Sequence, residues 1–173
     1  MNPNFPYIEI SIQDQLLRLF KADAVVEYSI STSALGPGQQ KNSNQTPLGW
    51  HVLRAKIGHN APLNSVFVGR RLSGEIYSSQ LADQFPSRDW ILTRILWLSG
   101  CEVGRNRLKN VDTMQRFIYI HGTPDTEPMG EAKSHGCIRM RNKDVVELFD
   151  VIAVGTPIWL QESTFARISC RSV

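Results

Sequence analysis

Short runs in which apolar and polar residues alternate constrain the fold of this chain more than any other feature. Residues 7–12 (YIEISI), 15–20 (QLLRLF) and 24–31 (AVVEYSIS) show this pattern. Alternation with a period of two places every second side chain on one face of a β-strand. Gln13 and Asp14 separate the first two runs, which favours a hairpin. The sequence therefore predicts three consecutive strands at its start.

Further strand-like segments follow, each bounded by glycine, proline or polar turn residues. They cover residues 50–58, 65–72, 93–100, 116–122 and 156–161. One segment, residues 142–154, has the i, i+3, i+4, i+7 apolar spacing of a helix with a buried face, and Asn142 is a candidate cap for its first turn. Residues 69–90 are predicted as a loop with a short helix. The expected fold class is mostly β, with one or two helices.

Length and composition indicate one globular domain. The chain has 173 residues, 42% hydrophobic and 20% charged, so residues 1–173 are expected to form a single domain with one core. The formal net charge is +3, and the basic residues occur in short groups such as Arg70 and Arg71. This pattern argues against a nucleic-acid partner and is compatible with a small anionic substrate.

The sequence also bears on location. The N-terminal residues have no basic residue before Arg18 and no unbroken apolar core, which argues against a secretory signal. No run of about 18 apolar residues predicts a membrane span. The three cysteines, Cys101, Cys137 and Cys170, are odd in number and widely spaced, unlike a disulfide framework. A cytoplasmic location is therefore expected, or a periplasmic one if Met1 is not the natural start.

A histidine, a glycine and a cysteine lie side by side in residues 134–140 (SHGCIRM). A free thiol titrates near ~8.5, and a neighbouring imidazolium can lower its pKa by several units, so a nucleophilic cysteine needs a histidine partner. Cys137 has two candidates: His135, two positions before it, and His121, at the end of the predicted strand 116–122. Pairing of that strand with the SHGCIRM segment would bring His121 alongside the thiol.

Neighbouring residues suit acyl-transfer chemistry. Gly136 has no Cβ, so a substrate carbonyl can approach its backbone closely, and the amides of Gly136 and Cys137 are candidates for an oxyanion hole. Arg139 lies two residues beyond the thiol and can hold a carboxylate. The long loop of residues 32–49 is rich in turn residues and is expected to be functional or mobile, and residues 122–134 are expected to form a loop that can fold back over the pocket.

The histidines, cysteines and some of the cationic residues also fit other interpretations. His121, His135 and Cys137 can supply three zinc ligands, but no C-x-x-C spacing and no fourth ligand support a metal site, so none is predicted. Cys101 and Cys170 are expected to be inert, buried thiols. The residues near His51 and His59 are unreactive, which indicates structural or solvated histidines. A set of cationic residues can contact a substrate carboxylate or form a solvated surface: Arg105, Arg107 and Lys109.

Five segments in order resemble the L,D-transpeptidase catalytic domain, the YkuD family. They are STS, QTPLGWHVLRAKIG, LSGCEVGRNR, NVDTMQRFIYIHGT and SHGCIRM, and the resemblance covers about residues 7 to 161. It implies a β-sandwich-like fold and a cysteine acyl-enzyme. Carried over by residue, Cys137 would be the nucleophile and His121 its general base. His135 and Gly136 would shape the site, and Ser134 would orient His121.

The resemblance also implies a substrate. Arg139, His51 and Thr123 would contact a peptidoglycan stem peptide or muropeptide, no metal or cofactor is expected, and a carbapenem is a candidate acylating agent. Such enzymes open the bond between the L-centre of the third stem residue, commonly diaminopimelate, and a terminal D-alanine. With no export signal seen, we expect an L,D-carboxypeptidase of muropeptide recycling. An L,D-transpeptidase that forms 3-3 cross-links or exchanges D-amino acids is the alternative, and a non-catalytic muropeptide-binding domain is a remote one. The oligomeric state stays open.

Overall fold

The computed structural model describes residues 6–165, and within them the alternating segments form ten β-strands accompanied by two α-helices and one 3-10 turn. The elements are β1 (Tyr7–Ser11), β2 (Leu16–Phe20), β3 (Val25–Ser31), β4 (Gly49–Ile57), β5 (Ser65–Val68), β6 (Arg71–Ile76), α1 (Ser79–Gln84), β7 (Ile91–Gly100), η1 (Lys109–Val111), β8 (Tyr119–Gly122), β9 (Ile138–Met140), α2 (Asn142–Val151) and β10 (Pro157–Gln161). The predicted mostly β fold with one or two helices is confirmed.

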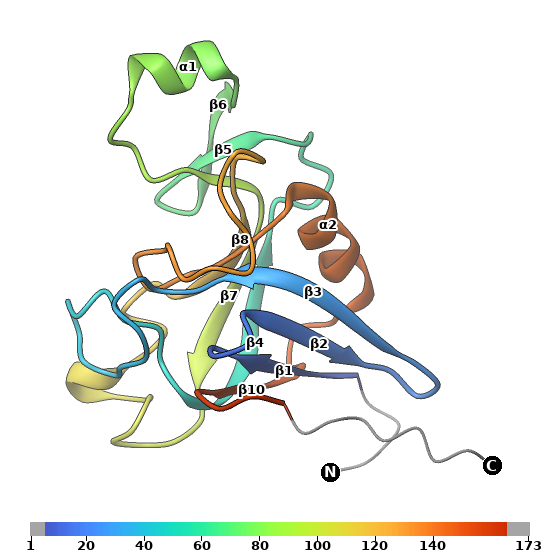
Figure 1. Ribbon diagram of the computed structural model, residues 1–173, viewed down its shortest axis with the longest axis vertical. Helices are drawn as coiled ribbons and strands as arrows, with labels where there is room; N and C mark the ends of the chain where they lie inside the picture. Colours follow the sequence, from blue (N-terminus) through green and yellow to red (C-terminus); the bar gives the residue numbers. More distant parts are fainter. Residues whose placement is uncertain (1–5, 166–173) are drawn as a thin grey trace.

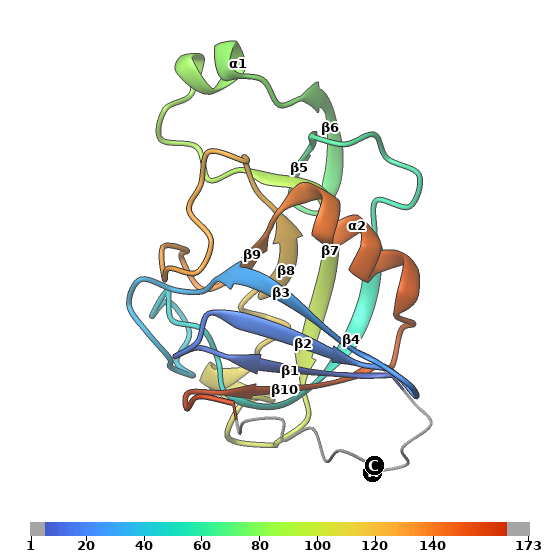
Figure 2. The same cartoon turned by 45° about the vertical axis from the view of Figure 1, so that its right-hand side comes forward.

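All the strands belong to one curved sheet. Their order is β4-β10-β1-β2-β3-β9-β8-β7-β5-β6, and β4 pairs with β7 as well as with β10. The eight strands β4-β10-β1-β2-β3-β9-β8-β7 therefore form a closed ring around one interior. Two halves of the sheet face each other across it, which gives a sandwich-like body (Figure 2). β5, β6 and α1 continue beyond β7 and project from one end of that body (Figure 1).

The core fills the interior of this closed sheet. Fully buried aliphatic side chains from both halves meet there, including Ile10, Leu17 and Leu96. Helix α2 adds its apolar face to the same cluster, and the predicted amphipathic pattern is confirmed by the burial of Val145 and Leu148. Helix α2 packs against β7 and β8, and β8 carries His121.

The ends of α2 differ from the prediction. The helix stops at Val151, short of the predicted end at residue 154, and Ile152 is its C-cap. Arg141 occupies the N-cap position without a side-chain cap, so the assignment of Asn142 as the cap is wrong. Asn142 is instead the first helical residue, and its side chain bonds away from the helix, to Thr93 and Thr123.

Two predicted strands are broken by left-handed backbone. Gly69 and Arg70 have φ values of 55° and 68°, so the predicted strand 65–72 becomes a hairpin of β5 and β6. The sequence predicts a loop with a short helix over residues 69–90. The loop prediction is wrong where β6 forms, whereas the short helix is present as α1. Phe117 has φ of 58°, and β8 begins only at Tyr119 rather than at residue 116. No helix within residues 6–165 is long and apolar enough to span a membrane.

Candidate active site

Strands β8 and β9 bring the two reactive segments of the sequence together. They pair in parallel, with Ile120 opposite Ile138 and His121 opposite Arg139. Paired residues share a face, and residues two apart along a strand do so as well. Cys137, the residue immediately before β9, therefore lies on the same face as His121, whereas Ile120 and Ile138 point into the core. This is the juxtaposition that a cysteine–histidine site requires.

The thiol of Cys137 is held between two backbone groups. The amide of Tyr119 donates to Sγ at 3.4 Å, and Sγ–H donates to the carbonyl of Phe117, also at 3.4 Å. The side chain packs on a small apolar cluster that includes Tyr119 and Ile95. Burial raises the pKa of the Cys137 thiol to about 12, while the Tyr119 amide acts in the opposite direction. The free thiol is therefore neutral at physiological pH.

The imidazole of His121 is buried and fixed in one tautomer. Its Nδ1 lies 2.8 Å from the carbonyl oxygen of Gly122. A carbonyl only accepts hydrogen bonds, so Nδ1 carries the proton and Nε2 keeps its lone pair. Burial lowers the pKa of His121, although the Gly122 carbonyl and Asp89 oppose this. The imidazole is neutral at physiological pH, with a base nitrogen available for proton transfer.

The resting pair is thus a neutral thiol and a neutral imidazole. The sequence predicts a thiolate favoured by a neighbouring imidazolium, whereas desolvation raises the pKa of Cys137 and lowers the pKa of His121, which disfavours that charged pair. A neutral pair suits general-base catalysis, in which His121 takes the thiol proton while Cys137 attacks.

The turn before Cys137 depends on Gly136. Its φ of 122° is a conformation that side-chain-bearing residues rarely adopt, and an added Cβ would lie 3.3 Å from the Gln45 carbonyl oxygen. Thr46 Oγ1 donates to the Gly136 carbonyl at 3.0 Å. The loop after β3, which the sequence indicated as functional or mobile, therefore packs directly against the SHGC turn.

Ser134 closes the same turn. Its hydroxyl donates to the Cys137 carbonyl at 2.5 Å and accepts from the Gly136 amide at 3.2 Å. Two expectations change as a result. Ser134 orients the thiol-bearing turn rather than His121, which Gly122 holds. Because the Gly136 amide is already bonded, the Cys137 amide is the member of the predicted oxyanion pair with no partner among residues 6–165.

Arg139 binds two carboxylates that the sequence did not point to. Its guanidinium contacts Asp89 at 2.8 Å and Glu127 at 3.1 Å, and Asp89 also lies 3.4 Å from His135 Nδ1. Burial alone would raise the pKa of Asp89, but the nearby charges of His121, Arg139 and His135 lower it. Asp89 lies in the connection between α1 and β7, where no motif marks it, so only the folded chain reveals this role.

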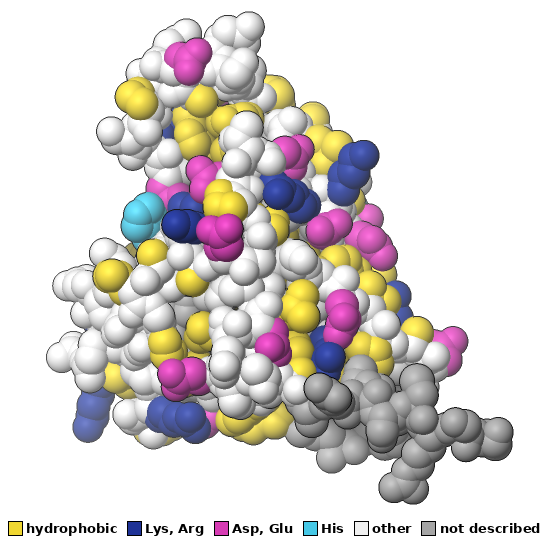
Figure 3. Space-filling view, viewed as in Figure 1, with side chains coloured by type: hydrophobic (Ala, Val, Ile, Leu, Met, Phe, Trp, Pro, Cys, Tyr) yellow, Lys and Arg dark blue, Asp and Glu magenta, His cyan; other side chains and the backbone are white. Residues whose placement is uncertain are grey.

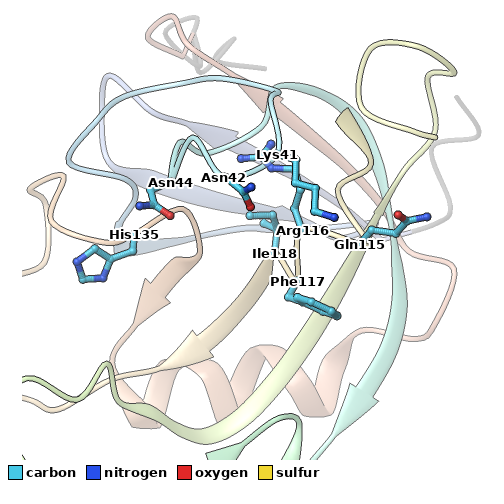
Figure 4. Close-up of a pocket in the computed structure, with 8 residues that line it drawn as sticks. All are labelled: Lys41, Asn42, Asn44, Gln115, Arg116, Phe117, Ile118 and His135. Atoms are coloured by element: carbon cyan, nitrogen blue, oxygen red, sulfur yellow. The ribbon is translucent and has the colours of Figure 1, made fainter. Parts of the chain in front are cut away.

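Two hollows are lined by residues that neighbour Cys137 and His121 in the β8–β9 region, although neither of these two residues lines them, and the hollows share His135. One, of about 260 Å³, is lined by charged and polar side chains that include Asp89, Thr123 and Arg139. Side chains of both charges gather beside a histidine on this face of the molecule (Figure 3). The other, of about 160 Å³, is lined by Lys41, Asn42, Asn44, Gln115, Arg116, Phe117, Ile118 and His135 (Figure 4). Thr123 and Arg139, for which the family resemblance implies substrate contact, both line the larger hollow.

Other candidates lie elsewhere. His51 is buried in β4, and Gly49 O and Thr113 Oγ1 bond its two ring nitrogens, so its position fits a structural role rather than substrate contact. Arg105 pairs with Glu102, and the expected cluster Arg105, Arg107 and Lys109 lines neither hollow at His135.

The remaining thiols are less informative. Cys101 is exposed, so the expectation that it is buried is wrong; partial desolvation nevertheless raises the pKa of its thiol. Cys170 lies outside the described residues. Within residues 6–165, no three His, Cys, Asp or Glu side chains are grouped as a metal site.

Comparisons with known proteins agree with this geometry. A 47-residue segment is 47% identical to YqjB of Bacillus subtilis, named as an L,D-transpeptidase, and covers 27% of each chain. A 43-residue segment is 44% identical to YbiS of Escherichia coli, also named as an L,D-transpeptidase, and covers 25% of this chain and 14% of that one.

Solved structures share the fold. An L,D-transpeptidase from Mycobacterium smegmatis superimposes with a TM-score of 0.52 at 18% identity, over 90% of this chain and 58% of that one. L,D-transpeptidase 3 from Mycobacterium tuberculosis, in complex with a faropenem-derived adduct, gives 0.55 at 16% identity over 91% and 62%. The chain spans about three-fifths of these structures. The family model of the YkuD L,D-transpeptidase catalytic domain matches residues 6–160, and this chain belongs to that family.

Proposed function

We propose that this chain is a cysteine acyl-transfer enzyme that opens the bond between diaminopimelate and the terminal D-alanine of peptidoglycan tetrapeptides, with water as the acceptor. The carrying observation is the placement of Cys137 and His121 on one face of the β8–β9 pair, beside hollows that meet at His135. In this proposal the product is a tripeptide, and the activity is that of an L,D-carboxypeptidase.

The proposed reaction begins with proton transfer. His121 Nε2 takes the proton of Cys137 as Sγ attacks the carbonyl carbon at the L-centre of diaminopimelate. The Cys137 amide stabilises the oxyanion that forms. Collapse of the tetrahedral intermediate breaks the C–N bond, and the imidazolium returns its proton to the amine of the departing D-alanine. A thioester on Cys137 remains, and water, deprotonated by His121, hydrolyses it to the tripeptide carboxylate and the free thiol.

Water as the acceptor requires no second peptide-binding subsite beside Cys137, so one bound stem is enough for the reaction. We also propose a cytoplasmic location, where the substrate would be a recycled muropeptide. Export of the natural protein, seen by fractionating the cells that make it, would contradict that location.

The second candidate is L,D-transpeptidation, favoured by the presence of a hollow on each side of His135. An amine from a second stem would then resolve the same thioester as a 3-3 cross-link, and a free D-amino acid would give exchange. We also propose that carbapenems acylate Cys137, because solved relatives include one complex with imipenem and one with a faropenem-derived adduct.

Mass spectrometry of products separates these functions. The purified protein is incubated with disaccharide-tetrapeptide, and loss of one alanine without a dimer supports the carboxypeptidase. A dimer as the main product supports the transpeptidase and contradicts our proposal. No turnover, together with a thiol that does not react with a carbapenem, indicates a muropeptide-binding domain instead.

Two matched cysteine variants locate the chemistry. Cys137→Ala is expected to abolish turnover, whereas Cys101→Ala, at an exposed position away from both hollows, should leave it unchanged. Turnover by Cys137→Ala at more than a trace would contradict the assignment of the nucleophile.

A further inference from the structure

A buried chain of hydrogen bonds runs from Thr93 to the backbone that follows His121. It links the start of α2, the end of β8 and an irregularity in β7, where the pairing register with β8 shifts between Leu92 and Ile95. The two polar side chains at its centre, Thr93 and Asn142, are 0% and 3% exposed. Neither contacts a hollow, so their role must be exerted through other residues.

Thr93 has an unusual backbone. Its φ is 67°, in the left-handed region, where β-branched residues are outliers. Such a conformation persists only where the surroundings hold it, and it is found most often at functional sites. Here the Asn64 amide donates to Thr93 Oγ1 at 3.0 Å, and the Thr93 hydroxyl donates to Asn142 Oδ1 at 2.5 Å.

The direction of these bonds fixes the Asn142 amide. The Thr123 carbonyl can only accept, so the Asn142 atom that faces it is Nδ2, and the Oδ1 atom faces the Thr93 hydroxyl, which donates to it. Nδ2 then faces the other way and donates to the Thr123 carbonyl at 2.8 Å. A side chain at Gly122 would collide with Asn142 Oδ1 and with the Leu92 carbonyl, so glycine at this position makes room for the contact.

The backbone that Asn142 holds is the backbone that orients His121. The Thr123 amide donates to the Met140 carbonyl at 3.2 Å, while Asn142 holds the Thr123 carbonyl. The peptide group between Gly122 and Thr123 is therefore held through the Thr123 N–H, and the next carbonyl along the chain, Thr123 O, is held by Asn142. The carbonyl of that same peptide, Gly122 O, accepts the hydrogen bond from His121 Nδ1.

We propose that Thr93 and Asn142 are a positioning pair that keeps His121 in its Nδ1–H tautomer by fixing the Gly122–Thr123 peptide. Without the pair, the Gly122 carbonyl can turn, the proton can move to Nε2, and the base nitrogen is lost. The catalytic consequence rests on the proposed acyl-transfer function, but the effect on the tautomer does not.

The test compares two variants of one residue. Thr93→Val keeps the shape and the β-branch but removes the hydroxyl, whereas Thr93→Ser keeps the hydroxyl. The tautomer of His121 is read by ¹⁵N NMR of histidine-labelled protein, with its signals assigned by their loss in His121→Gln. The wild-type protein and Thr93→Ser should show the Nδ1–H form, and Thr93→Val should populate the Nε2–H form.

Turnover of disaccharide-tetrapeptide should follow the tautomer. We expect kcat to fall about tenfold or more in Thr93→Val, with KM changed less than about twofold, because only the general base is impaired. Thr93→Ser should remain within about twofold of wild type. Asn142→Asp removes the hydrogen-bond donor to Thr123 but keeps the size of the side chain, so it should resemble Thr93→Val. It replaces Thr93→Val in the test if Thr93→Val does not fold.

Two results would overturn the proposal. One is a Thr93→Val protein, less stable or not, that keeps the Nδ1–H form of His121. The other is a Thr93→Ser protein as altered in tautomer as Thr93→Val. Because NMR needs no substrate, a protein with the expected tautomers but no turnover of tetrapeptide would count against the proposed function alone.

Discussion

His51 and His121 have similar surroundings at one ring nitrogen and different surroundings at the other. Both histidines lie on strands, both are 1% exposed, and each has Nδ1 within 2.9 Å of a backbone carbonyl oxygen. Burial lowers the pKa of each, in His51 to about 4. The difference lies at the second nitrogen. Thr113 Oγ1 bonds Nε2 of His51, whereas no side chain among residues 6–165 bonds Nε2 of His121.

This comparison separates structural from reactive histidines in one fold. A carbonyl at Nδ1 and burial are common to both, so neither feature marks an active site. A ring nitrogen without a protein partner among residues 6–165, on the strand face that also carries Cys137, is what distinguishes His121. Each histidine can therefore be tested against the other as a matched control.

The largest expected effect is on catalysis. His121→Gln should lower kcat/KM for disaccharide-tetrapeptide by about 10²-fold or more, since general-base catalysis is typically worth that much. His51→Gln should keep the activity per folded molecule, because Gly49 and Thr113 already bond both ring nitrogens of His51 and leave neither for proton transfer. Steady-state kinetics on both variants, corrected for the folded fraction, checks this. Equal losses in the two variants would remove the distinction between them.

The second effect is on stability and pH. The pKa of His51 falls from 6.5 to about 4 on folding, so its contribution is complete above pH 6.5. As the pH falls from 6.5 towards 4, the unfolded chain takes up a proton that the folded chain does not, and stability decreases by about 3 kcal/mol from this residue. His121 acts in the same direction.

Urea unfolding at several pH values measures this contribution. His51→Gln should be less stable than wild type at pH 7, by about 1–3 kcal/mol for the lost buried hydrogen bonds. It should also lose less stability than wild type between pH 6.5 and 4. Parallel curves for the two proteins would show that His51 is not the titrating group.

The smallest expected effect concerns the turn of residues 134–137, which holds Cys137 and has no counterpart beside His51. Ser134→Ala removes the hydrogen bonds to the Cys137 carbonyl and the Gly136 amide. We expect a loss of about 1 kcal/mol in stability and a fall of several-fold in kcat/KM, because the thiol is less well placed. Unchanged kinetics would mean that the loop after β3 alone fixes the turn.

Much of the fold follows from local pattern. The alternation in residues 7–12 and 24–31 and the apolar face of α2 reflect burial, which periodicity reports directly. The errors fall where single residues adopt left-handed backbone, as at Arg70 and Phe117. Neither residue type signals such a turn, so the late start of β8 could not be foreseen. Glycine does signal a turn, so Gly69 beside Arg70 marks the hairpin of β5 and β6 that the predicted single strand 65–72 overlooks.

The site was predictable only where it is contiguous. Cys137 and its flanking residues form a motif, and His121 ends a recognisable strand. Asp89 and Thr93 act from distant segments, and their roles arise from contacts that exist only after folding. The pKa directions of Cys137 and His121 were also missed, because burial, which sets both, is a property of the tertiary structure.

In the proposed mechanism, Cys137 forms an acyl-enzyme and His121 is the general base. Rapid-quench intact-mass spectrometry during turnover of disaccharide-tetrapeptide tests it most directly. We predict a transient adduct equal to the substrate minus alanine, mapped to Cys137 and strongly reduced in His121→Gln. An adduct on another residue, or one that forms equally fast in His121→Gln, would contradict the account.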